Sequence, residues 1–109
     1  MLTKFCCLLC RDISWTSGGD YSEPLDAARG ETLQFLFIPS FHNVYRMPTK
    51  EAFDNCDFNE ATFVGFLPPV WYTITEAEGD VLYFACKKYE HCKDKDQKIQ
   101  VNVLGDITA

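Results

Sequence analysis

The chain has 109 residues, of which 47% are hydrophobic and 15% aromatic, and its formal net charge is −6. This length fits one domain with a single core, and the acidic charge excludes functions that need a basic surface, such as binding to nucleic acid or to an anionic membrane face. No apolar run reaches the roughly 20 residues of a transmembrane helix, so we expect no membrane span. We also expect a monomer.

The first 11 residues leave three interpretations open. Lys4 precedes the short apolar run Phe5-Cys6-Cys7-Leu8-Leu9-Cys10, as in a signal peptide, but no small-residue cleavage site follows. The segment 1–11 is a truncated or misassigned start, a remnant of an export signal, or a first strand, and the domain proper is expected over residues 12–109. Cys7-x-x-Cys10 could bind a metal or act in redox chemistry, although no second such pair accompanies it.

Short apolar and alternating segments predict strands along the rest of the chain. A loop is expected over residues 16–29, and the predicted strands are 12–15, 32–38, 42–46, 61–66, 70–75, 81–86 and 99–103. Pro48 and Thr49 are helix start signals, so one short helix is predicted over residues 48–56. Many short strands with one helix indicate an all-β sandwich.

Three residues with metal-binding side chains lie beside the predicted strands. His42 falls within one of them, Cys86 ends another, and His91 follows Cys86 on a charged turn. A type 1 copper site needs two His and one Cys, with a weak axial Met or Gln. Met47 is a possible soft ligand, but packing is the favoured interpretation because the chain is already leaving the site there.

The order and spacing of these motifs resemble the phytocyanin branch of the cupredoxins, the small blue copper proteins. The matching features are Gly30-Glu31-Thr32-Leu33-Gln34-Phe35, Phe41-His42-Asn43-Val44, Ala52-Phe53-Asp54-Asn55-Cys56, Tyr83-Phe84-Ala85-Cys86, His91-Cys92 and Gln97-Lys98. The resemblance implies a Greek-key β-sandwich of the cupredoxin type and one type 1 copper ion. It also implies the residues of the site: copper ligands His42, Cys86 and His91, an axial ligand Gln97, and a disulfide between Cys56 and Cys92.

The loop between the second His and the axial ligand departs from the family pattern. The family usually places four residues there and a Gly just before the axial ligand. This chain has five residues between His91 and Gln97, and Asp96 stands at the Gly position. Asp lacks the backbone freedom of Gly, so this departure bears on the axial assignment rather than on the three strong ligands.

The resemblance implies a one-electron carrier that is not an enzyme, with a redox protein as its partner. The lysines near the site predict either local docking of an acidic partner or only a solvated loop; they are Lys87, Lys88, Lys93, Lys95 and Lys98. The implied disulfide favours an extracellular or other oxidising compartment, whereas reduced cysteines would fit the cytosol.

Other functions remain as alternatives at this point. The same fold could serve as a copper- or zinc-binding interaction module without a redox role. An enzyme with Cys86 as nucleophile and a His as base would need an oxyanion-hole motif, which the sequence does not show. A multicopper oxidase fragment is disfavoured because His-x-His pairs are absent.

Overall fold

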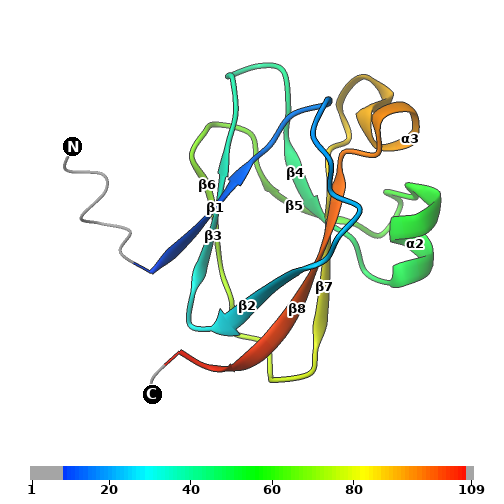
Figure 1. The fold of residues 1–109 in the computed structure, drawn as a ribbon. Coiled ribbons are helices and arrows are strands. Elements are labelled where there is room, and N and C mark those ends of the chain that lie inside the picture. Colours follow the sequence, from blue (N-terminus) through cyan, green and yellow to red (C-terminus); the bar gives the residue numbers. More distant parts are fainter. Residues whose placement is uncertain (1–8, 108–109) are drawn as a thin grey trace.

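The computed structural model describes residues 9–107, which form two β-sheets packed face to face (Figure 1). The smaller sheet has the order β1-β3-β6 and consists of β1 (Cys10–Ser14), β3 (Thr32–Leu36) and β6 (Val70–Thr73). The larger sheet has the order β2-β8-β7-β4-β5 and consists of β2 (Leu25–Arg29), β8 (Lys98–Asp106), β7 (Val81–Ala85), β4 (Val44–Arg46) and β5 (Thr62–Gly65). Both sheets are mixed, because β1 runs parallel to β3 and β2 runs parallel to β8.

The core lies between the two sheets and is rich in aromatic rings. Phe35 of β3 and Phe84 of β7 are fully buried, with ring centroids 5.4 Å apart. Trp15, directly after β1, packs edge-on against Phe35 at 5.1 Å. In β8 the expected alternation is confirmed, since its residues are buried and half-buried in turn from Lys98 to Val103. Burial of these apolar faces stabilises the sandwich.

Two parts of the strand prediction are wrong. Residues 25–29 were expected in a loop, but they form β2, which pairs with β8 along the edge of the larger sheet. The strand expected over residues 42–46 begins only at Val44, so His42 lies in the connection that precedes β4. The other predicted strands are present with shorter or longer ends.

Part of the N-terminal prediction lies outside the described residues. Residues 1–8, which include Cys7 of the Cys7-x-x-Cys10 pair, fall there. Within the described chain, β1 begins at Cys10, so the end of the 1–11 segment contributes to the first strand.

Short helical segments lie outside the two sheets, and one of them carries part of the candidate site. The predicted short helix is α2 (Lys50–Asn55), whose N-cap residue Thr49 accepts a hydrogen bond from the Ala52 amide at 3.0 Å. Residues that the sequence indicates as a charged turn instead form the 3₁₀ turn η1 (Lys88–Glu90) and the one-turn helix α3 (His91–Lys95). Figure 1 shows α3 close to the end of the sandwich where the chain enters β4.

Candidate metal centre

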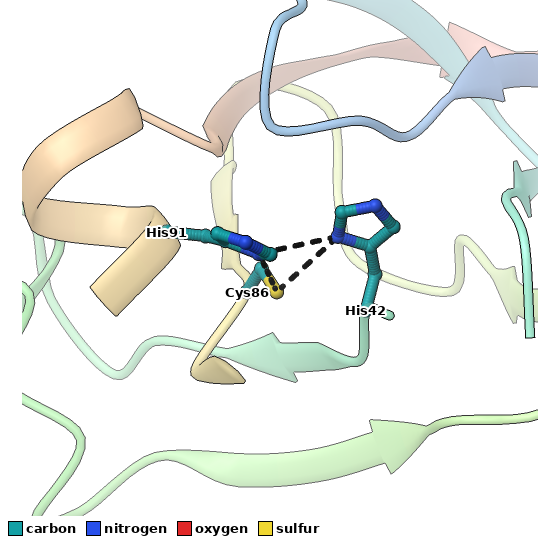
Figure 2. Close-up of side chains that lie close together, drawn as sticks. All are labelled: His42, Cys86 and His91. Carbon is teal, nitrogen blue, oxygen red and sulfur yellow. Dashed lines mark hydrogen bonds between the residues drawn. The ribbon is translucent and has the colours of Figure 1, made fainter. Parts of the chain in front are cut away.

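Three side chains from separate segments meet at this end of the sandwich (Figure 2). His42 lies two residues before β4, Cys86 directly follows β7, and His91 begins α3. Their ligand atoms all lie within 4.8 Å of one another. The structure therefore brings together the Cys and the two His that the sequence pattern singled out.

The spacing of the three donor atoms fits a single metal ion. His42 Nδ1 and His91 Nδ1 are 3.2 Å apart, and Cys86 Sγ lies 4.0 Å from the former and 3.6 Å from the latter. The circle through those three atoms has a radius of about 2.1 Å, a distance at which transition-metal ions such as zinc bind histidine nitrogen. One metal could thus contact all three donors with little movement of the chain.

A tight turn presents His42 to the site. The Phe41 amide donates to the Ile38 carbonyl at 3.3 Å, and Ser40 has a left-handed backbone with φ of 76°. The ring of Phe37 meets the His42 ring edge-on at 5.9 Å, and only 8% of His42 is exposed. Packing therefore fixes the imidazole before any ligand binds.

Cys86 is a fully buried free thiol at the end of β7. Its amide donates to the Gln97 carbonyl at 3.0 Å, which extends the pairing of β7 with β8. Burial raises the pKa of the Cys86 thiol, while the backbone amides of Asn43 and Lys88, as hydrogen-bond donors to its sulfur, oppose that rise. A metal that binds this sulfur must therefore displace a proton.

His91 is held by the loop around it rather than by a strand. Its neighbour Cys92 forms a disulfide with Cys56 at the end of α2, which is the pairing that the family resemblance implies. The two residues directly before His91 are Tyr89 and Glu90, and they have left-handed backbones with φ of 52° and 59°. His91 is half-buried and so more exposed than His42.

Both imidazoles are in the form that binds metals. Burial is the main cause that lowers the pKa of His42 and of His91 below 6.5. Nearby cationic groups also lower these pKa values: His91 acts on His42, and Lys95 acts on His91. Neutral rings at pH 7 leave a nitrogen lone pair available for a metal.

Gln97 lies beside this group and is unusual for a buried polar residue. It is fully buried, and neither atom of its amide forms a well-oriented hydrogen bond with the described residues. The amide is nevertheless close enough to His42 to oppose the lowering of that ring's pKa by burial. An unsatisfied buried amide costs about 1–3 kcal/mol, which a cation beside it would offset. One sulfur, two imidazole nitrogens and a weak amide oxygen form a donor set that fits copper.

Other residues from the sequence analysis have packing roles instead. Met47 is 1% exposed and packs with Ala52, Cys56, Ala85 and Cys92, so it belongs to a second small core. Lys98 Nζ donates to the carbonyls of Phe53 and Asp54 at 3.0 and 3.1 Å. This lysine therefore caps the end of α2.

Asn43 and Trp15 are site neighbours that the sequence analysis missed. The Asn43 side-chain oxygen accepts a hydrogen bond from the Lys87 amide at 2.8 Å, one residue after Cys86. The Trp15 indole donates to the Asn43 carbonyl at 2.9 Å. Periodicity could have marked Trp15 only as apolar, because its partner lies 28 positions away in the chain.

Comparisons with known proteins agree with this geometry. Residues 15–97 match a family model described as a plastocyanin-like domain. The peeling cupredoxin of cucumber (Cucumis sativus) is 38% identical over 77 residues, which are 70% of this chain and 54% of that protein. The chain thus spans about half the length of this curated relative.

Solved structures show the same fold. Cucumber stellacyanin with Cu²⁺ at pH 7.0 is 30% identical with a TM-score of 0.69, over 84% of this chain and 87% of that one. Spinach plantacyanin is 22% identical with a TM-score of 0.63, over 86% of this chain and 98% of that one. The expected fold class, a β-sandwich of the cupredoxin type, is confirmed.

Proposed function

Because the chain belongs to the plastocyanin-like domain family and is a phytocyanin-like cupredoxin, we propose that it is a one-electron carrier with a single type 1 copper site. In this proposal His42, Cys86 and His91 are the strong ligands and Gln97 is the weak axial ligand. The convergence of the three donor atoms around one point carries the proposal. A copper ion held there would supply one-electron oxidation and reduction.

The chain's part in this function is to keep the ligands in place. Cys86 and Gln97 are fully buried and are linked by a backbone hydrogen bond. The His42 ring packs edge-on against Phe37. A site fixed by packing changes little when the charge of its metal changes, so little reorganisation opposes electron transfer. Burial also raises the pKa of the Cys86 thiol, which is the opposite of what an activated nucleophile needs and disfavours the enzyme alternative.

Copper reconstitution tests the proposal directly. The metal-free protein, titrated with Cu(II), should bind one equivalent and gain an intense visible absorption band from the Cu(II)–thiolate bond. Its electron paramagnetic resonance spectrum should then be that of a type 1 site. Cys86→Ser should abolish the band, whereas Cys56→Ser with Cys92→Ser keeps the Cys86 sulfur and should retain at least part of it.

The same titration separates the competing function. The three donors also suit zinc, so a zinc-binding interaction module would bind Zn(II) tightly and give a colourless or normal Cu(II) spectrum. That outcome, or more than one bound copper per chain, contradicts an electron carrier of this kind.

We propose the His91 edge of the site as the point where electrons enter and leave. His91 is the more exposed imidazole, and the exposed Tyr89 ring stands 5.6 Å from it. Between Lys87 and Lys98 the chain carries five lysines and three acidic residues, although the chain as a whole has a net charge of −6. Lys88 and Lys98 have backbone carbonyl partners, and Lys87 Nζ lies 5.5 Å from the centroid of the Tyr45 ring. Lys93 and Lys95 are therefore the main charges that would attract an acidic partner.

Ionic strength tests this docking role. With an acidic redox protein as partner, the electron-transfer rate should fall as salt rises, and Lys93→Glu with Lys95→Glu should slow it further at low salt. Lys50→Glu, on α2, makes the same charge change as one of these substitutions at another surface and should have a smaller effect than Lys93→Glu alone. A rate that does not depend on salt would contradict the docking role and would show that these lysines are only part of a solvated loop.

We also propose that the protein works in an oxidising compartment, at the cell surface or in the secretory pathway. The Cys56–Cys92 disulfide supports this location, since such bonds persist where thiols are not kept reduced. No helix within residues 9–107 has the length and hydropathy that crossing a membrane requires.

A further inference from the structure

One hydrogen bond joins the two sheets directly beside the candidate metal centre. Trp15 follows β1 of the smaller sheet, and Asn43 precedes β4 of the larger sheet. The Trp15 indole N–H donates to the Asn43 carbonyl at 2.9 Å. His42, a proposed ligand, is the residue next to Asn43 in the chain.

Packing fixes the direction of this indole N–H. Trp15 has no exposed surface, and its own amide donates to the Leu36 carbonyl at 2.8 Å. The centroids of the Phe35 and Tyr21 rings each lie 5.1 Å from that of the Trp15 ring. A fully packed ring with a polar edge has one place for its donor, and here that place is the Asn43 carbonyl.

Asn43 connects this donor to the sulfur side of the centre. Its side-chain oxygen accepts from the Lys87 amide at 2.8 Å, directly after Cys86. Its own backbone amide lies near enough to the Cys86 sulfur to oppose the rise in the pKa of that thiol. One residue therefore contacts Trp15, the chain after Cys86 and the Cys86 sulfur itself.

We propose that Trp15 is a positioning residue for the metal centre, which holds Asn43 so that His42 and the Cys86 sulfur keep their relative placement. The inference deepens the proposed function and rests on it for its copper readouts, though not for its metal-free ones. Without the indole N–H, the Asn43 carbonyl loses a donor and the His42–Asn43 segment gains freedom. The Asn43 amide is then less well directed toward the Cys86 sulfur. A sulfur ligand that accepts weaker hydrogen bonds favours the oxidised state of its metal.

The competing explanation is that Trp15 only fills the core. A core-filling ring would make any Trp15 variant less stable as a whole, and every protected amide would exchange faster to the same extent. A positioning role predicts a local effect at Asn43 and Lys87 beyond the global one. It also predicts a changed copper spectrum in protein that is fully folded.

Trp15→Phe removes the indole N–H while retaining an aromatic ring, and Trp71→Phe is the matched control. Trp71 is the other tryptophan of the chain, and its indole donates to Gln34 Oε1 at 2.7 Å on the outer face of the same sheet. In metal-free Trp15→Phe, the Asn43 and Lys87 amides should exchange with solvent roughly tenfold faster relative to the core amide of Phe84. Trp71→Phe should leave this ratio unchanged.

In the copper-loaded protein the same variant should show a lower reduction potential and an altered copper hyperfine splitting, with Trp71→Phe like the unmodified chain. If Trp15→Phe does not fold, a benzothiophene ring in place of the Trp15 indole keeps the shape and lacks the N–H, and it should give the same pattern. Equal exchange ratios and an unchanged potential in the isosteric variant would overturn the positioning role. A chain that never forms the blue site would instead refute the proposed function, while the metal-free exchange ratios would still decide the role of Trp15.

Discussion

Gln97 combines full burial with an amide that lacks well-oriented hydrogen bonds among the described residues. Its backbone is well held, because its carbonyl accepts from Cys86 and its amide donates to the His91 carbonyl at 3.1 Å. The side chain is thus held where the metal-free protein provides it with no well-oriented hydrogen bond among the described residues. Residues in such positions commonly serve a ligand rather than the fold.

Gln97→Met should therefore have opposite effects on the two forms of the protein. The metal-free variant should unfold at higher urea, with a gain of about 1–2 kcal/mol, because the unsatisfied amide is removed. The copper-loaded variant should have a higher reduction potential, because a thioether favours Cu(II) less than an amide oxygen does. An unchanged potential would remove Gln97 from the coordination sphere.

Asp96 stands directly before Gln97, in the loop that has one residue more than is usual in the family. It ends α3 in the left-handed region with φ of 52°, at the position where the family has Gly. Asp tolerates this conformation better than most residues, whereas a β-branched residue does not. This position therefore has a backbone shape that suits Gly, although Asp stands there.

Substitutions at Asp96 should follow this backbone preference. Asp96→Gly should change the free energy of unfolding by less than about 1 kcal/mol, since relief of the left-handed strain is offset by the flexibility of Gly. Asp96→Val should destabilise by about 1–2 kcal/mol. Urea unfolding of the three proteins tests the order, and equal stability of the Gly and Val variants would contradict it.

At the scale of elements, α3 is too short to hold its own shape, and its position depends on covalent attachment. A five-residue helix has little intrinsic stability. Cys92 ties it to Cys56, where α2 ends in a left-handed residue with φ of 52°. The tether joins positions 36 residues apart and fixes the residue next to His91.

Removing the disulfide should affect both stability and metal affinity. Cys56→Ala with Cys92→Ala should lower the free energy of unfolding by roughly 3–4 kcal/mol, from the chain entropy of the opened loop. Copper should also bind less tightly because His91 is no longer held in place. Calorimetry and competitive copper titration measure the two effects; a loss of stability with unchanged affinity would show that the loop around His91 is ordered without the tether.

The limits of sequence reasoning are clearest for individual elements. The alternation of Ile99, Val101 and Val103 was sufficient to predict β8, because every second residue faces the core. β2 was missed because Leu25-Asp26-Ala27-Ala28-Arg29 has neither clear alternation nor high strand propensity, and its pairing with β8 supplies the structure that the segment does not encode alone. The three donors were found because Cys86 and His91 are close in sequence and His42 is the other of the two histidines. The Trp15–Asn43 contact, by contrast, is a tertiary feature without a local sequence pattern.

At the scale of the whole molecule, a second polar link joins the sheets away from the metal centre. Arg46 of β4 donates to Tyr72 of β6 and to Glu76, both at 2.6 Å, and the Tyr72 hydroxyl also donates to Glu76. Burial alone would raise the pKa of Glu76, but its hydrogen bonds and the Arg46 charge outweigh burial and lower the pKa below 4.5. The ionised carboxylate is therefore part of what holds the two sheets together.

This link should make the protein sensitive to acid. The unfolded chain takes up a proton at Glu76 near pH 4.5 and the folded chain only at lower pH, so the stabilisation is present above that value and is lost as the pH falls through the folded pKa. Glu76→Gln should lower the free energy of unfolding at pH 7 by about 1–3 kcal/mol and should weaken its dependence on pH below 4.5. Urea midpoints from pH 7 to 3 test this, with the exposed Glu60→Gln as control; parallel pH profiles of the native and Glu76→Gln proteins would contradict the prediction.

The parallel pairing of β2 with β8 also has a consequence for biosynthesis. Leu25 pairs with Val101 and Ala27 with Val103, so a growing polypeptide cannot complete the larger sheet until β8 has emerged from the ribosome. Gln97, whose carbonyl fixes the Cys86 backbone, emerges just ahead of that strand. The pocket is therefore completed only after translation has passed β8, so under the proposed function copper would enter the finished domain.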